Sequence, residues 1–205
     1  MVLALLLALL VRVPFKGVGF IRTIILIPTV TSMVVVSVIW GLMYHPNSGL
    51  INGILETLSL PTQKFLIDTG QAMPSLVVMT IWKDVGFNMI FFLAGLLSIP
   101  GSYYEAAMLD GANRWQLFRH ITIPLLRGTT VFVLITSMIS AFKVFTPVFL
   151  MTKGGPSSVT RVIVLYIYEN AFIFNKMGYA AAISVILALI LLIASVIQIY
   201  FRSRS

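Results

Sequence analysis

The sequence predicts an all-α fold, a polytopic bundle of helices that cross a membrane. Of the 205 residues, 59% are hydrophobic and only 10% are charged, whereas a soluble domain carries about 25% charged residues. Long apolar runs alternate with short polar stretches, and a transmembrane helix needs about 20 apolar residues. The length fits one transmembrane domain that covers residues 1–205.

We expect one partial span and four complete ones. The first apolar run, residues 1–12, is too short to cross a bilayer, so it is interpreted as the second half of a helix that begins upstream. The complete spans are predicted at 23–44, 73–99, 125–151 and 179–201. In the first of these, Pro28 lies in the first two turns, where Thr and Ser hydroxyls can bond the carbonyls that proline leaves free.

The segments between the spans are polar and rich in turn residues. Residues 45–72 contain a short amphipathic stretch at 50–58, and Lys153-Gly154-Gly155-Pro156 predicts a sharp turn after the third span. Residues 161–174 alternate aromatic and aliphatic side chains and fit a segment along the membrane surface.

Basic residues predict the orientation in the membrane. The net charge is +8, from 14 Lys and Arg against 6 Asp and Glu. Eight of the basic residues lie on the side of the loop 100–124, namely Arg12, Lys16, Arg22, Arg114, Arg119, Arg127, Arg202 and Arg204. Four lie on the opposite side, Lys64, Lys153, Arg161 and Lys176, and Lys83 and Lys143 lie within spans. By the positive-inside rule, the loop 100–124 and the C-terminus are cytoplasmic, and the positive charge needs no nucleic-acid partner.

The loop 100–124 carries signals for two short helices. Ser102 and Glu105 fit a capping box, and Asp110-Gly111 fits a helix stop. Asn113 and Gln116 fit a second cap. Trp115, Phe118 and Ile121 follow at helical spacing, and Pro124 suits the first turn of the next helix. Helices this short are not stable alone in water, so the loop either docks on a partner or packs on the ends of its own spans.

The same residues resemble the EAA motif of ABC-importer permeases. Glu105-Ala106-Ala107, then Asp110-Gly111-Ala112, Phe118, Ile121 and Pro124, resemble the carbohydrate branch of that family, the maltose and glycerol-phosphate type. Ile123 stands where the family usually has Leu. Thr152-Lys153-Gly154-Gly155-Pro156 also resembles the family, although Thr146 after Phe145 replaces a common Asp.

This resemblance implies an N-terminally truncated, type I ABC-importer permease fold, about the last two thirds of such a subunit. It implies import of a sugar across the cytoplasmic (inner) membrane by alternating access. The implied partners are an ABC ATPase dimer, a second permease and an extracytoplasmic solute-binding protein at the outer loops. The residues implied to couple to the ATPase are Glu105, Ala106, Ala107, Asp110, Gly111, Ala112, Trp115, Phe118, Ile121 and Pro124.

Polar residues inside the spans are the candidates for a substrate pathway. Lys83 and Asp84 lie about ten residues into their span, roughly 15 Å deep. Charges at that depth need a wet cavity or a partner. The candidate pathway comprises Thr80, Lys83, Asp84, Asn88, Thr136, Ser140 and Lys143. These residues line a path for a hydroxyl-rich solute, or they hold the helices together by interhelical bonds. Phe87, Phe142 and Phe145 could stack on sugar rings, but packing is the more common role of phenylalanine in a span.

Several chemistries have no support in the sequence. There is no cysteine, and His45 and His120 lie in different loops, so we expect no metal site and no cofactor. A phosphate-binding Gly-Lys-Ser/Thr loop is missing, so the chain is not expected to be an enzyme that hydrolyses ATP. The alternative function is a secondary transporter or channel subunit that uses Lys83 and Asp84 as an intramembrane ion pair.

Overall fold

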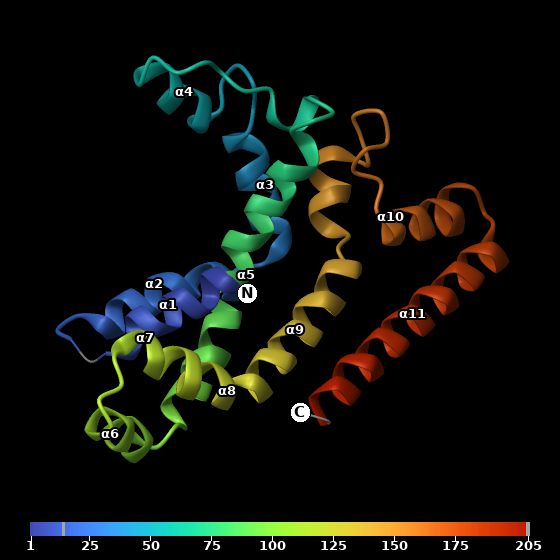
Figure 1. Cartoon of the computed structure of the whole chain (residues 1–205). Coiled ribbons are helices and arrows are strands. Elements are labelled where there is room, and N and C mark those ends of the chain that lie inside the picture. Colours follow the sequence, from blue (N-terminus) through green and yellow to red (C-terminus); the bar gives the residue numbers. More distant parts are fainter. Residues whose placement is uncertain (14, 204–205) are drawn as a thin grey trace. The chain divides into compact units, whose positions relative to one another are not determined.

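A computed structural model describes residues 1–13 and 15–203, and all regular elements within them are helices (Figure 1). The chain divides into two compact units that interleave along the sequence. The first unit comprises Met1–Thr29, Asp84–Ile139 and Leu192–Ser205, and the second comprises Val30–Lys83 and Ser140–Leu191. The long helices α5 (Ala72–Leu97) and α11 (Met177–Ser203) each contribute residues to both units.

The first unit is built on close packing of small residues. Its other elements are α1 (Val2–Arg12), α2 (Val18–Val30), α6 (Gly101–Leu109), α7 (Arg114–Leu117), the π-helix η2 (Phe118–Thr122), α8 (Ile123–Leu125) and α9 (Arg127–Phe142). Ala4, Ala8 and Val11 recur on one face of α1 and are fully buried against Met89 and Phe92 of α5, among others. Small side chains let helix backbones approach closely, which replaces the hydrophobic effect inside a membrane.

The second unit contains the predicted loops 45–72 and 153–178. Its further elements are α3 (Met33–Met43), α4 (Leu50–Thr57), η1 (Phe65–Ile67), the π-helices η3 (Val148–Thr152) and η4 (Glu169–Ile173), and α10 (Ile163–Tyr168). One cluster packs around Val36, Tyr44 and Met79, and a second packs around Leu76, Val148 and Leu165. Phe145 stacks on Phe149, with ring centroids 5.1 Å apart, at the edge of that second cluster.

A buried asparagine organises the loop that contains α4. The side chain of Asn52, 2% exposed, donates to the carbonyls of Pro46 (2.7 Å) and Gln63 (2.8 Å) and accepts from the Gln63 backbone N–H (2.9 Å). Gln71 extends the network, because it accepts from the Phe65 N–H and donates to the Gln63 side chain. The polar face of α4 is therefore satisfied inside the loop.

Among the described residues, two helices, α5 and α11, have the length and composition of a membrane span. They cover nearly the same residues as the predicted spans 73–99 and 179–201. Two further pairs of helices, α2 with α3 and Arg114–Leu125 with α9, also qualify if each bent pair counts as one span.

At the predicted span 23–44, the helical structure departs from one uninterrupted helix over those residues in two respects. The helix begins earlier, at Val18, and it is interrupted between Val30 and Met33. Pro28 lacks the N–H that would bond the carbonyl of Ile24, which weakens this stretch. Ser32 then adopts an extended ψ of 135° and its carbonyl accepts from Val36, so it begins α3 as the N-cap residue.

The helical structure at the predicted span 125–151 is also interrupted. Helix α9 ends at Phe142, and residues 143–145 lie outside the helix before η3. Pro147 explains the position of the break, since its ring clashes with the carbonyl four residues earlier, that of Lys143, and cannot bond it. Proline is then well placed in the first turn of the helical segment that follows.

Gly86 allows α2 and α5 to pack closely, and a larger residue should destabilise the protein. A Cβ atom at position 86 would lie 2.3 Å from the Ile25 carbonyl oxygen, a backbone atom that cannot turn aside. We expect Gly86→Ala to lower the stability by about 1–3 kcal/mol, measured as the unfolding midpoint in detergent. Gly41→Ala in α3 is the control, because nothing lies within 4 Å of its new Cβ. Equal midpoints for the two variants would contradict this close packing.

Asn52→Asp should loosen the α4 loop without changing its shape. The substitution removes both donated bonds and places a carboxylate beside two carbonyl oxygens. Unsatisfied buried polar groups cost about 1–3 kcal/mol, so amide exchange over residues 46–63 should accelerate about five- to hundredfold. Asn47→Asp, at an exposed position in the same loop, should leave exchange unchanged. Unaltered exchange in Asn52→Asp would show that these bonds do not hold the loop.

Candidate functional site

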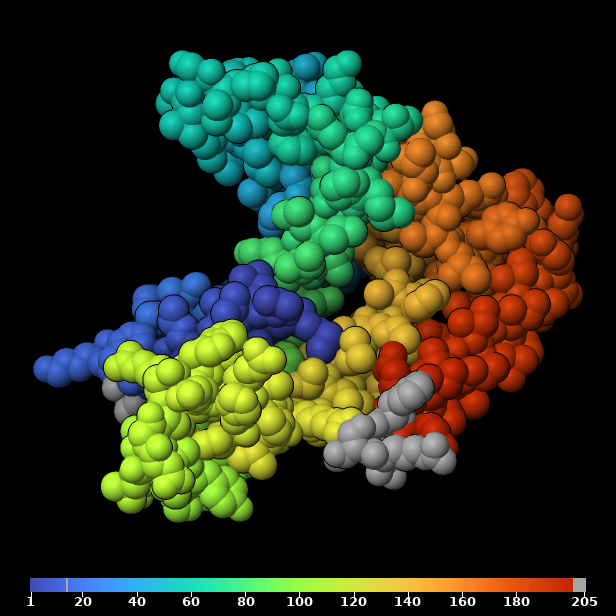
Figure 2. Space-filling view, in the orientation of Figure 1, coloured from blue at the N-terminus to red at the C-terminus, as the bar shows by residue number. Residues whose placement is uncertain are grey.

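The loop between α5 and α9 forms a separate group of short helices on the surface of the first unit. In the space-filling view these residues, α6 to α8, lie at the surface of the molecule in yellow-green (Figure 2). We call this segment, residues 100–126, the coupling loop. No residue of α6 or α7 is buried, so most of its side chains are available to a partner.

The predicted capping box of Ser102 and Glu105 is wrong. Helix α6 begins two residues earlier, at Gly101, with Pro100 at the N-cap and no side-chain cap bond. Ser102 is therefore inside the first turn, where its hydroxyl cannot cap. The fixed φ of Pro100, −60°, and its ψ of 136° suit the residue that precedes a helix. Glu105 is exposed and is not needed to begin the helix.

Gly111 forms the elbow between α6 and α7, as the sequence predicts. Its φ is +82°, in the left-handed region that favours glycine. The Ala112 N–H donates to the Ala107 carbonyl (2.9 Å) and the Gly111 N–H donates to the Met108 carbonyl (3.0 Å). This pair of bonds is the Schellman motif, which satisfies the last carbonyls of α6.

Helix α7 begins with the predicted capping box of Asn113 and Gln116. The Gln116 N–H donates to the Asn113 side chain (3.0 Å), and the Asn113 N–H donates to the Gln116 side chain (2.8 Å). Pro124 lies in the first turn of α8, as predicted. The elbow at Gly111 and the cap at Asn113 together set the direction of α7 relative to α6.

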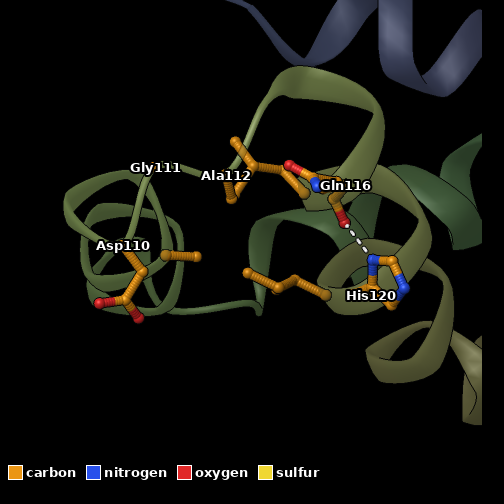
Figure 3. Close-up of a pocket in the computed structure, with 8 residues that line it drawn as sticks. Asp110, Gly111, Ala112, Gln116 and His120 are labelled. Carbon is orange, nitrogen blue, oxygen red and sulfur yellow. Dashed lines mark hydrogen bonds between the residues drawn. The ribbon is translucent and has the colours of Figure 1, made fainter.

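A shallow pocket lies between the elbow and the second helical segment (Figure 3). Asp110, Gly111 and Ala112 form one side, and Gln116 and His120 form the other. The His120 ring nitrogen Nδ1 is 3.2 Å from the Gln116 carbonyl oxygen. Ala107, Leu117 and Ile121 complete the lining, so the pocket presents both apolar and polar groups.

Large apolar side chains on the coupling loop are exposed to solvent. Leu109 is 90% exposed and Trp115 is 63% exposed, with the Trp115 ring 5.8 Å from that of Phe118. Exposed apolar groups of this size, framed by polar residues, are typical of a protein interface. The loop therefore has the features of a docking surface.

The predicted pathway residues lie in both units. In the first unit, Asn88 of α5 accepts a long bond from Ser137 of α9 (3.5 Å). The predicted pathway residue on α9 is the neighbouring Thr136. Its hydroxyl donates to carbonyls of its own helix, those of Phe132 and Val133, and not to Asn88. Asp84, also in this unit, is half-buried and takes part in an interaction with another group.

The remaining pathway candidates belong to the second unit. Lys83 is buried, at 8% exposure, and takes part in an interaction with another group. The Thr80 hydroxyl donates to the carbonyl of Leu76 in the same helix (2.8 Å). Ser140 and Lys143 are exposed. Within the described residues, no group of three or more His, Cys, Asp or Glu side chains could hold a metal ion.

Helices long and apolar enough to cross a membrane, together with an exposed loop of short helices, define a class, the integral membrane proteins with a surface open to a partner. Comparison with known proteins identifies the family. The model of the family described as "Binding-protein-dependent transport system inner membrane component" matches residues 1–205. The chain belongs to this family.

Individual relatives agree with this assignment. The chain is 34% identical over its whole length to a probable ABC transporter permease from Pyrococcus horikoshii, of which it covers 70%. It is 36% identical over 98% of its length to the sn-glycerol-3-phosphate transport system permease UgpA of Agrobacterium fabrum, of which it covers 69%. A chain in the crystal structure of a bacterial alginate ABC transporter, in complex with an alginate pentasaccharide-bound periplasmic protein, matches with a TM-score of 0.86 and 29% identity, over 96% of this chain and 69% of that one.

These comparisons confirm the predicted resemblance to an ABC-importer permease. They also confirm an all-α membrane protein of the inner membrane, and they place the chain among transport subunits. Membership of this family replaces the alternative of a secondary transporter or channel subunit.

Substitution of Gly111 tests the left-handed backbone of the elbow, because an added Cβ would meet no neighbouring atom. Nothing lies within 4 Å of a Cβ at this position, so only the left-handed backbone opposes a side chain, at about 1–2 kcal/mol. We expect Gly111→Val to disorder α7 and weaken partner binding while membrane insertion stays normal, measured by co-purification and by membrane fractionation. Gly111→Asn should be milder, since Asn tolerates this conformation. Gly101→Ala, in the same loop at an ordinary φ, is the control.

Proposed function

We propose that the chain is the permease subunit of an ATP-driven, binding-protein-dependent importer of a sugar or sugar-like solute. The observation that carries this proposal is the coupling loop, in which a Schellman elbow at Gly111 orients two short helices with exposed Leu109 and Trp115. A transporter that is not driven by an ATPase subunit has no need for such a surface on its cytoplasmic side. In this proposal a separate ATPase subunit hydrolyses ATP, and the chain itself is not an enzyme.

The chemistry of the loop fits an ATPase surface with an apolar cleft and a cation at its edge. Burial of a large apolar side chain contributes about 1.5–3 kcal/mol, so Leu109 and Trp115 supply most of the affinity. Glu105, exposed on α6, then supplies a charge-assisted contact. The other residues of the motif include Ala106 and Ala107, whose small side chains allow α6 to enter a narrow cleft.

The substrate class follows from the relatives and from the polar residues of the spans. The named relatives transport glycerol 3-phosphate and alginate, which are hydroxyl-rich solutes. Asn88 with Ser137 offers amide and hydroxyl groups of the kind that bind sugars. We propose that Thr80, Lys83, Asp84, Asn88, Thr136, Ser140 and Lys143 border the pathway, while Phe145 serves packing, since its ring stacks on Phe149.

The remaining partners follow from the same proposal. A second permease completes the pathway, and an extracytoplasmic solute-binding protein delivers the sugar to the loops 45–72 and 153–178. The Asn52 network supports this role, because it gives the loop 46–63 a fixed form before any partner binds. ATP binding would draw the two coupling loops together and open the cavity outward, which is alternating access.

Co-purification from native membranes tests the proposal directly. The chain is isolated in mild detergent and its companions are identified by mass spectrometry. An ATPase with a phosphate-binding loop, a second permease and a solute-binding protein are expected. Recovery of the chain with none of these, from membranes that contain them, would overturn the proposal.

Glu105→Gln should separate docking from folding. The structure shows no capping role for Glu105, so the helix content should be unchanged. Loss of one partner of a charged pair at an interface costs about 2–5 kcal/mol, a fall in affinity of tens to thousands of fold. Affinity for the ATPase subunit and sugar-stimulated ATP hydrolysis should both fall. The control for ATPase affinity is Glu56→Gln, at an exposed position of α4 outside the coupling loop. Native affinity in Glu105→Gln would show that the carboxylate is not part of the interface.

A further inference from the structure

Helix α6 contacts the rest of its unit mainly through one side chain, Tyr104. None of its nine residues is buried, and only Tyr104 and Ala107 are half-buried. Tyr104 packs against the buried cluster that contains Val11, Ile99 and Leu126. A helix that is otherwise exposed therefore has one large side chain directed into its own unit.

The Tyr104 hydroxyl lies at the centre of a hydrogen-bonded chain. Arg12 Nη1, from the last residue of α1, donates to it (3.3 Å), and the Arg12 guanidinium lies over the Tyr104 ring at 4.9 Å from the centroid. On its other side the hydroxyl is 3.0 Å from Thr122 Oγ1. One side chain thus joins α1, α6 and η2.

The bonds of this chain are consistent with one another when Tyr104 donates to Thr122. Arginine can only donate, so the Tyr104 oxygen accepts from Arg12 and its proton is available for Thr122. The Thr122 hydroxyl then donates to the Leu117 carbonyl, 3.4 Å away and five residues earlier. Each hydroxyl accepts once and donates once, so the bonds are mutually consistent and strengthen one another.

The chain ends at a place where the helix is already distorted. Residues 118–122 form a π-helix, and Thr122, only 3% exposed, directs its hydroxyl to a carbonyl of the preceding turn. π-Helical turns often mark functional positions. Leu126, one turn further on at the start of α9, is 2% exposed and belongs to the same core as Val11.

The end of α1 is also attached to α2. Arg22 Nη2 donates to the Val11 carbonyl (2.6 Å), one of the carbonyls that a helix C-terminus leaves without an intrahelical partner. Two guanidinium groups at this end also complement the helix dipole. A displacement of Tyr104 would therefore reach α1 through Arg12, and α2 through Arg22.

We propose that Tyr104 is a positioning residue that transmits movement of α6 to α1 and to the π-helix η2, which precedes α8 and α9. This inference rests on the proposed function, in which an ATPase moves the coupling loop. The tyrosine hydroxyl is bonded to Arg12 and to Thr122, and Thr122 is buried, unlike the exposed Leu109 and Trp115. Removal of the hydroxyl should then impair coupling and leave ATPase binding intact.

The test uses the assembled transporter with substitutions that remove single groups. Tyr104→Phe removes the hydroxyl and keeps the ring under Arg12, and Thr122→Val removes the other hydroxyl at nearly constant shape. Thr122→Ser restores that hydroxyl. Tyr103→Phe is the control, since Tyr103 is adjacent and 52% exposed. The readouts are ATPase-subunit affinity and the ratio of substrate-stimulated to basal ATP hydrolysis.

We expect Tyr104→Phe and Thr122→Val to keep ATPase affinity within about twofold, while the stimulation ratio falls about two- to tenfold, the range of one lost hydrogen bond. Thr122→Ser and Tyr103→Phe should retain the wild-type ratio. An unchanged ratio in Tyr104→Phe would overturn the proposal. So would a loss of affinity as large as the loss of stimulation, because Tyr104 would then only shape the docking surface.

A distance measurement tests the link without any ATPase. The chain has no cysteine, so spin labels can be attached at Leu10→Cys in α1 and Ser102→Cys in α6, both exposed positions. The distance distribution should be narrow and should broaden with Tyr104→Phe but not with Tyr103→Phe. Equal widths would overturn the link even if the ATPase binds. A broadened distribution together with failure of ATPase binding would instead leave the link standing and refute the proposed function.

Discussion

Inside a bilayer, a backbone N–H or C=O group without a partner costs several kcal/mol, and the fold of this chain follows from that constraint. It explains why every regular element in the described residues is helical. It also makes the breaks informative. The helices are interrupted at Ser32, where an extended residue begins α3, and four residues before Pro147, where the Lys143 carbonyl cannot be bonded. Bends in the spans thus have specific chemical causes.

Helices that gain no hydrophobic energy from each other in lipid must pack through shape. In the first unit this packing depends on small residues at the contact, with Ala4 and Ala8 on α1 and Gly86 on α5. Close backbone approach leaves little room for polar side chains. Where they occur, they bond a neighbouring helix, as Ser137 bonds Asn88, or their own backbone, as Thr80 and Thr136 do.

The coupling loop combines an ordered backbone with exposed apolar side chains. Its backbone is completely organised, by the Schellman bonds at Gly111 and the capping box of Asn113, yet its large apolar side chains are left exposed. A short segment with an ordered backbone loses little conformational entropy when it docks, which favours binding. The Arg12–Tyr104–Thr122 chain then connects this prepared surface to the helices behind it.

The sequence by itself determined the all-α class, the positions of α5 and α11 to within two residues, the Gly111 elbow and the Asn113 cap, because these depend on local composition and on signals within one turn. It missed the true start of α6, because a Ser-x-x-Glu pattern does not reveal that Pro100 already precedes the helix. Only the tertiary structure decided which polar groups meet, Asn88 with Ser137 instead of Thr136, and Tyr104 with Arg12 across 92 residues. Those pairings depend on how helices distant in sequence rotate and pack, which no local pattern specifies.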